Sequence, residues 1–449
     1  MEPPSANRHA LRFVLALLTI IMLGSVLLVL PISAASGHPT RLDDAFFTAV
    51  SAAAVNGLMV VDTADHWSIF GEVVILLLIQ IGGLGFAVGA SLLLLMLRRG
   101  QSSSLRDQML LRDGVPSLSL REAGDLTGHI VRYTLVVEAC GALLLAIRFA
   151  ADMPVPTALW QGLFHAISAY CNAGFDLQGH FTSMTPYRES VWINVVIMAL
   201  VQAGALGYLA VHAALTHRRW QPLPLDAKLV LLTNAVLLIG AAALFLAIEW
   251  DGVLAAAPPW ARPMTALFQS ASARTAGFST IAWNEAHPIT LYLWLGVMMV
   301  GGAAGSTAGG VKLATAGVIV AVVASTLAGR TIAHVFGRRL APSLVARALT
   351  VVASFMALHF ALSALLALTE DRFGLGDLSF ISLTFEMMSA LSTAGISTGI
   401  TPALTMAGKL VLCAAMIAGR IGPLTLAYAL QRRQRTVRYK FPEESVRIG

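Results

Sequence analysis

Long apolar segments alternate with short ones along this chain of 449 residues. The long segments, each able to cross a bilayer, lie near 13–30, 69–97, 130–150, 189–215, 228–249, 289–328, 347–368 and 404–430. Between the two members of each successive pair lies an apolar segment too short to cross, at 43–54, 158–171, 261–273 and 377–392. The pattern predicts an all-α membrane protein with eight spans and four re-entrant half-helices.

A four-residue motif follows each short apolar segment. The motifs are Val55-Asn56-Gly57-Leu58, Asn172-Ala173-Gly174-Phe175, Thr275-Ala276-Gly277-Phe278 and Thr393-Ala394-Gly395-Ile396. Their glycines lie 117, 103 and 118 residues apart. A short motif that recurs at near-even spacing indicates internal repetition. We therefore expect four tandem helix–pore-loop–helix repeats around one central pore.

These repeats divide the chain into consecutive regions. Residues 1–128 hold the first repeat and a cytoplasmic connector, and residues 129–225 hold the second repeat. Residues 226–340 hold the third repeat with a glycine-rich intramembrane loop, and residues 341–430 hold the fourth. Residues 431–449 are expected to form a cytoplasmic tail.

Composition and charge support a membrane protein. Hydrophobic residues make up 57% of the chain and charged residues 12%, against about 25% charged in a typical soluble domain. Basic residues gather in alternate loops: Arg8, Arg12, Arg98, Arg99, Arg106, Arg112, Arg218, Arg219, Lys228, Arg330, Arg338, Arg339, Arg347, Arg432, Arg433, Arg435 and Arg438. The other loops carry Asp43, Asp44, Asp62, Asp65, Asp152, Asp251, Glu370 and Asp371. The positive-inside rule then places both termini in the cytoplasm and all four motifs outside, and the basic charge does not indicate nucleic-acid binding.

The motifs are candidates for a cation filter. A ring of backbone carbonyls can replace the hydration shell of a monovalent cation, and glycine permits the backbone angles and close approach that this requires. Four half-helices would also point their partially negative C-terminal ends at one centre. The candidate filter residues are Val55, Asn56, Gly57, Asn172, Ala173, Gly174, Thr275, Ala276, Gly277, Thr393, Ala394 and Gly395. The competing explanation is that these glycines pack helices together.

The sixth long segment is interrupted by glycines, and the last contains an arginine. A glycine-rich stretch cannot form a stable helix interior, so we expect two half-helices joined by a loop at membrane depth that lines a cavity. The candidate gate residues are Gly301, Gly302, Gly305, Ser306, Thr307, Gly309, Gly310 and Arg420. A small-residue packing surface and a snorkelling arginine are the alternatives. The order of residues does not match a phosphate-binding loop.

Other chemistry finds little support in the sequence. Cys140, Cys171 and Cys413 form neither a disulfide framework nor a metal-binding pair. There is no HExxH motif, and most acidic residues lie in loops, so an enzyme is not expected. His165 and Glu386 fall in half-helices, where we expect structural hydrogen bonds to neighbouring groups.

Four stretches now permit a comparison with a known family. They are Ser272–Phe278, Gly305–Gly310, Ala418–Thr425 and Phe441–Gly449. On these stretches, and over nearly its whole length, the chain resembles the Trk/Ktr/HKT superfamily of potassium transporters, most closely the bacterial KtrB-type branch. The last two stretches favour Ktr over Trk.

The resemblance implies a fold, a cargo and partners. It implies a potassium uptake subunit of the bacterial cytoplasmic (inner) membrane, with K+ bound by carbonyls at the four filter glycines and no cofactor on this chain. It implies that the glycine-rich loop gates the pore with the help of Arg420. It further implies a homodimer seated on an octameric cytosolic ring of KtrA-like subunits that bind ATP or ADP, with sodium stimulating flux. The alternative is a secondary potassium transporter coupled to Na+ or H+.

Two features qualify the resemblance. The first motif has Asn56 where the family usually has Thr, and we expect its side chain to face away from the pore so that its carbonyl stays available. Glycine at all four positions is the potassium-like pattern, whereas sodium-preferring plant relatives have serine at the first. The basic segments from Arg98 to Arg121 and from Arg432 to Gly449 are expected on the cytoplasmic face, either as docking sites for an acidic partner or as membrane anchors.

Overall fold

The structure is a computed structural model that describes residues 5–101, 120–217, 219–330, 332–372 and 379–422. Most of this part of the chain is helical. The helices are α1 (Ser5–Val29), α2 (Leu42–Ala54), α3 (Thr63–His66), α4 (Ile69–Gln101), α6 (Leu120–Phe149), α7 (Val155–Cys171), α8 (Val191–Thr216), α9 (Leu225–Glu249), α10 (Arg262–Ser272), α11 (Pro288–Met299), α12 (Leu313–Leu327), α13 (Pro342–Arg372), α14 (Phe380–Ser392) and α15 (Met406–Ile421). Two short strands, β1 (His334–Val335) and β2 (Arg338–Arg339), pair as an antiparallel hairpin.

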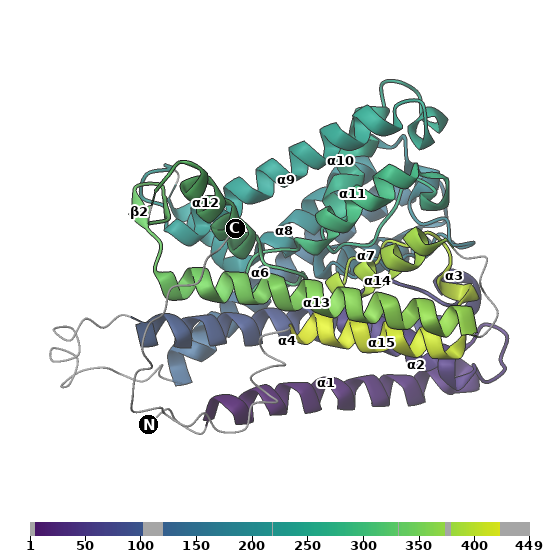
Figure 1. Ribbon diagram of the computed structural model, residues 1–449. Helices are drawn as coiled ribbons and strands as arrows, with labels where there is room; N and C mark the ends of the chain where they lie inside the picture. Colours follow the sequence, from purple (N-terminus) through teal and green to yellow (C-terminus); the bar gives the residue numbers. More distant parts are fainter. Residues whose placement is uncertain (1–4, 102–119, 218, 331, 373–378, 423–449) are drawn as a thin grey trace.

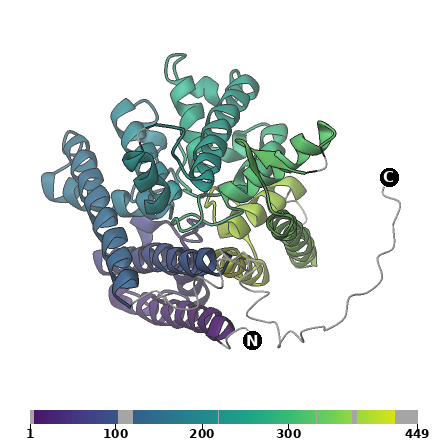
Figure 2. The ribbon, with the colours of Figure 1, turned by 90° about the vertical axis from the view of Figure 1, so that its left-hand side faces the viewer.

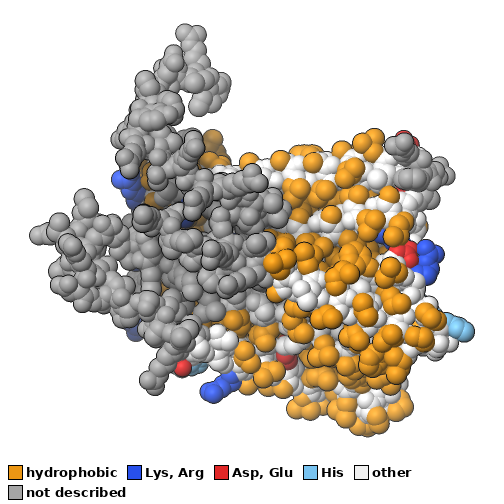
Figure 3. Space-filling view, turned by 90° about the horizontal axis from the view of Figure 1, so that it is seen from below, with side chains coloured by type: hydrophobic (Ala, Val, Ile, Leu, Met, Phe, Trp, Pro, Cys, Tyr) orange, Lys and Arg blue, Asp and Glu red, His pale blue; other side chains and the backbone are white. Residues whose placement is uncertain are grey.

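The long apolar segments form long helices. Within the described residues, five helices are long and apolar enough to cross a membrane: α4, α6, α8, α9 and α13. Large hydrophobic side chains on their outer faces are exposed, among them Val136, Ile239 and Phe360. Figure 3 shows hydrophobic side chains covering much of the described surface on one face, with charged side chains mostly toward its margins. An apolar surface of this extent requires a bilayer, and the chain is an integral membrane protein.

The four short apolar segments are helices of 11 to 17 residues: α2, α7, α10 and α14. Their C-terminal halves are almost entirely buried. Each packs against a long neighbour, α2 on α1, α7 on α6, α10 on α9 and α14 on α13. Their small residues, as in the run from Thr48 to Ala54, allow this close approach of helices. The C-terminal halves of the short helices therefore lie inside the molecule, whereas their N-terminal ends reach its surface, as at Leu42, Val155 and Phe380.

The helices follow one another around a centre. In the view of Figure 2, the colours pass from purple at the lower left through blue and teal to green at the right, with the yellow-green C-terminal helices back near the first. Contacts between α2 and α15 join the beginning of the chain to its end. In Figure 1, α1, α4, α13 and α15 run roughly along one direction. This arrangement brings the C-terminal ends of the short helices toward the interior.

The sixth apolar segment is broken, as predicted. Helix α11 ends at Met299 and α12 begins at Leu313, and residues 300–312 between them are not helical. A bridge between Val300 and Val311 closes the base of this loop. The sequence did not predict the break in α8, where Gly207 has a φ of 68°. The end of the predicted last span, 423–430, and the basic tail lie outside the described residues, as do the side chains of the Arg98–Arg121 segment.

Candidate functional site

Three of the four motifs begin at helix ends with a left-handed residue. Val55, Asn172 and Thr393 cap α2, α7 and α14 with φ values of 56°, 60° and 56°. The next residue closes each cap; Asn56 N, for example, donates to the Ser51 carbonyl at 2.8 Å. Glycine usually occupies such a cap, and a β-branched residue there is strained. Strain of this kind persists only where the surrounding fold imposes it, and it concentrates at functional sites.

The third motif is different. Helix α10 ends in a right-handed cap at Ala273, and the left-handed residue comes later, at Thr275, with a φ of 72°. The motif glycines Gly57, Gly174 and Gly277 have φ values of 101°, 72° and 81°. Gly395 has a φ of 77°. All four segments therefore contain two left-handed residues, one at the first position of the motif and one at its glycine.

The four motif glycines face one another in a ring. A Cβ atom added to Gly57 would lie 2.5 Å from the carbonyl oxygen of Ala173, and one added to Gly174 would lie 2.9 Å from that of Ala276. A Cβ on Gly277 would lie 3.4 Å from the carbonyl oxygen of Ala394.

The ring closes back on the first motif. A Cβ added to Gly395 would overlap the carbonyl oxygen of Asn56 and would lie 3.0 Å from the Cα of Gly277. The order around the ring is thus the order along the chain, and each glycine meets a carbonyl group of the next segment. The structure brings together the twelve residues that the sequence singles out as filter candidates, and it leaves no room for a side chain at the glycines.

Serine side chains of the short helices support the segments from behind. Ser51 Oγ accepts a hydrogen bond from Gly57 N at 3.1 Å. Ser168 Oγ donates to the Phe175 carbonyl at 2.7 Å, and Ser272 Oγ donates to the carbonyl of Phe278. These bonds fix the backbone of three segments directly beside the glycines.

The side chain of Asn56 points away from the ring. Its amide nitrogen donates to the carbonyl oxygens of Ser389 and Ala390 in α14, at 3.3 and 3.0 Å. Its Oδ1 accepts from Leu58 N at 3.2 Å. The unusual residue of the first motif therefore ties that segment to the fourth short helix and leaves its own carbonyl oxygen facing Gly395.

His165 forms a hydrogen bond with the chain segment that follows the second motif. Its Nδ1 donates to the carbonyl of Gln161 at 2.7 Å, so its Nε2 is the acceptor for Leu177 N at 3.2 Å. The ring is therefore neutral and fully bonded, as expected of a structural residue. Gln269 has a similar place behind the third motif, where its Nε2 donates to Thr280 Oγ1 at 2.8 Å. Sequence reasoning did not single out Gln269.

Glu386 does the same for the fourth motif. Its Oε1 accepts from Ser397 Oγ at 2.6 Å and from Thr398 N at 2.8 Å. Its Oε2 accepts from Thr401 Oγ1 at 2.9 Å. A buried carboxylate can be retained when several donors satisfy it, so Glu386 acts here as a structural residue bonded to nearby backbone and hydroxyl groups.

The glycine-rich loop packs against three of the motifs. Thr307 Oγ1 lies 3.1 Å from both the Tyr170 carbonyl and Asn172 Oδ1. A Cβ on Gly301 would lie 3.1 Å from the methyl group of Thr275, and one on Gly309 would overlap the hydroxyl of Thr393. The loop is thus built from small residues because larger ones would collide with the motif segments.

The other side of the glycine-rich loop packs against the break in α8. Ala303 N donates to the Ala205 carbonyl at 2.7 Å. A Cβ on Gly302 would clash with that same carbonyl oxygen. Gly207, at the break, faces Gly305 and Ser306. The sequence signal for this contact was the set of small residues Ala203, Gly204, Ala205 and Gly207, which looks like an ordinary helix-packing surface.

Arg420 fastens the loop from α15. Its Nη1 donates to the Thr307 carbonyl at 2.5 Å, and its Nη2 donates to the Gly82 carbonyl in α4 at 2.7 Å. Its guanidinium carbon lies 4.4 Å from the ring centroid of Phe86. Arg420 is only 1% exposed, so it does not snorkel toward the membrane surface.

A second cation lies beside the same aromatic ring. Lys312 Nζ donates to the Ala308 carbonyl at 2.6 Å and lies 5.2 Å from the Phe86 centroid. Gly310, with a φ of 61°, turns the chain between Ala308 and Lys312. Gly82, Phe86 and Lys312 were not among the candidates from sequence. An arginine can be recognised as unusual in a span, but its carbonyl and aromatic partners cannot.

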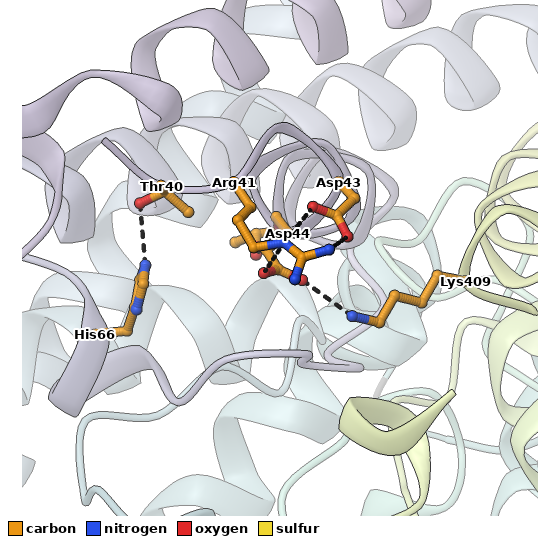
Figure 4. Close-up of polar contacts among 7 residues, drawn as sticks. Thr40, Arg41, Asp43, Asp44, His66 and Lys409 are labelled. Atoms are coloured by element: carbon orange, nitrogen blue, oxygen red, sulfur yellow. Dashed lines mark hydrogen bonds and ion pairs between the residues drawn. The ribbon is translucent and has the colours of Figure 1, made fainter. Parts of the chain in front are cut away.

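An ion pair joins the first turn of α2 to α15. Figure 4 shows Lys409 of α15 reaching Asp44 in the first turn of α2, at 3.0 Å. Arg41 pairs with Asp43 at 2.9 Å. Partial burial of the Asp43 carboxyl raises its pKa, but the hydrogen bond and charge of Arg41 outweigh burial and the net pKa is lower than usual. Asp43 and Asp44 also stabilise α2, because negative charges in the first turn interact favourably with the partial positive charge of a helix N-terminus.

The described residues hold no group of three or more His, Cys, Asp or Glu side chains that could bind a metal ion. The three cysteines are free. The candidate site is lined by backbone carbonyl oxygens and lies at the ends of the short helices.

Comparisons with known proteins identify the family. The model of the TrkH family, described as cation transport proteins, matches residues 18–436. The potassium/sodium uptake protein NtpJ of Enterococcus hirae is 34% identical, and the match covers 96% of this chain and 95% of that protein. The Ktr system potassium uptake protein B of Bacillus subtilis is 33% identical over 96% of this chain and 94% of its own.

Two further matches agree with these. The Ktr system potassium uptake protein B of Vibrio alginolyticus is 34% identical over 97% of this chain and 94% of its own. The crystal structure of the potassium transporter TrkH from Vibrio parahaemolyticus has the same fold, with a TM-score of 0.72 at 20% identity, covering 96% of this chain and 86% of that one. These relatives are ion transporters rather than enzymes, and the chain belongs to the TrkH family of cation transport proteins.

Proposed function

We propose that this chain is the membrane subunit of a potassium uptake system and passes K+ selectively down its electrochemical gradient. The observation that carries the proposal is the ring of Gly57, Gly174, Gly277 and Gly395, in which carbonyl groups of four segments meet at one place. Carbonyl oxygens can replace the water around K+. The negative ends of α2, α7 and α14 add a favourable potential for a cation. No covalent chemistry is required, in keeping with a family of transporters.

The glycine-rich loop is the proposed gate. It packs against Asn172, Thr275 and Thr393 and is held by Arg420. Residues Gly301, Gly302, Gly305, Ser306, Thr307, Gly309 and Gly310 form the moving part in this proposal. Movement of the loop would break the hydrogen bond between Arg420 and Thr307. In this proposal, that bond stabilises the closed state and is absent from the open one.

The proposed topology has eight spans in four repeats, with both termini in the cytoplasm of a bacterial inner membrane. The repeats are 1–128 with its connector, 129–225, 226–340 and 341–430, followed by the tail 431–449. The placement of α2, α7, α10 and α14 at matching points along the chain supports this division. The division of acidic and basic loops supports the orientation.

The proposed assembly is a homodimer on a cytosolic regulatory ring. Two relatives are named as protein B of a Ktr system, and this supports a membrane subunit that works with a separate partner. We propose that the partner is an octameric, KtrA-like ring that binds ATP or ADP and controls the gate. Stimulation by sodium is part of the same proposal.

Rubidium uptake into liposomes that contain the purified chain tests the function. We expect uptake driven by a negative internal potential, inhibited by external potassium and much less by sodium. Uptake that needs a Na+ or H+ gradient with a fixed stoichiometry would instead establish the ion-coupled transporter. Uptake that sodium and potassium inhibit equally would contradict a potassium-selective filter.

A further inference from the structure

Arg274 is a buried cation beside the third motif and has no acidic partner. It directly precedes Thr275 and is 1% exposed. No carboxylate of the described residues forms an ion pair with it. A buried charge is normally paired or neutralised, so this arrangement needs an explanation.

The hydrogen bonds of Arg274 lead only to neutral groups. Its Nη1 donates to Asn234 Oδ1 in α9, and its Nε donates to the Ser270 carbonyl at 3.5 Å. Asn234 Nδ2 in turn donates to Gln202 Oε1 of α8 at 3.1 Å. Arg274 Nη2 and Gln202 Nε2 are buried without a partner. The network orients the guanidinium but does not neutralise it.

Among the described short helices, α10 is the one whose last turn is bonded by an arginine that lies just after it in sequence. Helices α2, α7 and α14 end in left-handed caps with Val55, Asn172 and Thr393, whereas α10 ends at Ser272 and Arg274 reaches back to the carbonyl of its last turn. The C-terminus of a helix carries a partial negative charge, which a cation offsets. Arg274 therefore offsets the negative end of the third half-helix, which attracts a cation in the filter less than it would without this charge.

We infer that Arg274 weakens cation binding at the filter and so lets the transported ion leave. This inference rests on the proposed function and names a residue that sets the affinity of the same site. Conduction needs binding that is favourable enough for entry but weak enough for exit. Because the guanidinium is buried, water and salt screen its repulsion of a nearby cation only slightly.

Kinetics of rubidium uptake into liposomes separate this role from a structural one. Arg274→Gln removes the charge, and Asn234→Asp places a carboxylate on the guanidinium while leaving Arg274 intact. Both should lower the apparent KM for rubidium, on the order of tenfold, without raising the maximal rate. Arg274→Lys keeps the charge and should give a KM closer to the wild type than Arg274→Gln does.

Arg262→Gln is the matched control. Arg262 lies at the other end of α10 and also donates to backbone carbonyls, those of Ala257 and Trp250. Because Arg262 is at the end of α10 away from the filter, the KM of Arg262→Gln should equal that of the wild type. A maximal rate that falls with an unchanged or higher KM in both Arg274→Gln and Asn234→Asp would overturn the inference. Wild-type protein without potassium-selective uptake would instead contradict the proposed function, so the two failures are distinguishable.

Discussion

Arg420 donates a hydrogen bond to the carbonyl oxygen of Thr307 at 2.5 Å, across 113 residues of sequence. The bond joins the last described helix to the centre of the glycine-rich loop. The same guanidinium also binds the Gly82 carbonyl in α4. One buried side chain thus connects parts of the chain that we assign to the first, third and fourth repeats, and it does so with carbonyl acceptors only.

Arg420→Ala should raise basal potassium flux. The substitution removes both hydrogen bonds and leaves the loop without its attachment to α15. Charge-assisted bonds of this kind contribute about 1.5–3 kcal/mol each, enough to shift a closed loop toward open forms by tenfold or more. Rubidium uptake without a regulatory partner measures the effect. Arg219→Ala, which changes an exposed arginine, is the control, and a flux equal to that of wild type in Arg420→Ala would remove the gating role.

Shortening the glycine-rich loop should also raise basal potassium flux. Deletion of the four residues 304–307, within the stretch 303–308, removes Thr307 and with it the contacts to Tyr170 and Asn172. We expect higher basal uptake, because the shortened loop no longer reaches the motif segments. Flux that falls or stays at the wild-type level, with normal amounts of protein in the membrane, would indicate that the loop packs the bundle instead of closing it.

Gly57→Ser and Gly277→Ser should reduce the preference for potassium over sodium. Both glycines have positive φ values, and a Cβ on Gly57 would lie 2.5 Å from the Ala173 carbonyl oxygen. The added side chain would displace the carbonyl groups around the ring. Competition of sodium and potassium against rubidium uptake gives the selectivity.

Gly240→Ser supplies the comparison for the glycine variants. Gly240 lies in α9, and a Cβ added there would meet no other atom within 4 Å. Its selectivity should therefore match the wild type. If Gly57→Ser and Gly277→Ser both kept wild-type selectivity as well, the filter assignment would be wrong.

The Asp44–Lys409 ion pair should stabilise the contact between α2 and α15. Both side chains are largely buried, at 15% and 14% exposed, so the pair is screened less than one on the surface. A double-mutant cycle with Asp44→Asn and Lys409→Gln should give a coupling free energy of about 1 kcal/mol from unfolding in detergent. In the Arg41–Asp43 pair, Arg41 is 78% exposed and Asp43 is 11% exposed. This pair should give a smaller value because its guanidinium stays in water, and equal coupling in the two cycles would contradict this ranking.

Much of the fold could be predicted from sequence because it depends on local patterns. The length of the apolar segments predicted the short helices closely, as at 43–54 and α2 (Leu42–Ala54). Two long helices begin well before the predicted spans, since α1 starts at Ser5 and not near 13, and α6 starts at Leu120 and not near 130. The glycines between Gly301 and Gly310 gave the break between α11 and α12. The break in α8 was missed, because one positive-φ glycine at Gly207 among other small residues looks like helix packing.

The candidate site could be predicted less completely. The motif glycines were found because they recur at even spacing. Three residues of the short helices recur in position but not in type. His165, Gln269 and Glu386 each form a hydrogen bond with the segment that follows a motif, and each does so with a different side chain. A repeat search cannot align such residues, and only their common hydrogen-bonding role in the fold makes them equivalent.

The sequence by itself determined that the chain enters a membrane, where its helices lie and which glycines are candidates for the filter. These properties follow from hydrophobic length and from the freedom of the glycine backbone, both of which are local. Tertiary structure alone decided that the glycines meet in chain order around one ring, that Asn56 turns toward α14, and that Arg420 binds Thr307. The partners in these contacts are mostly backbone carbonyl groups, which every residue carries, so only the fold can select which of them meet.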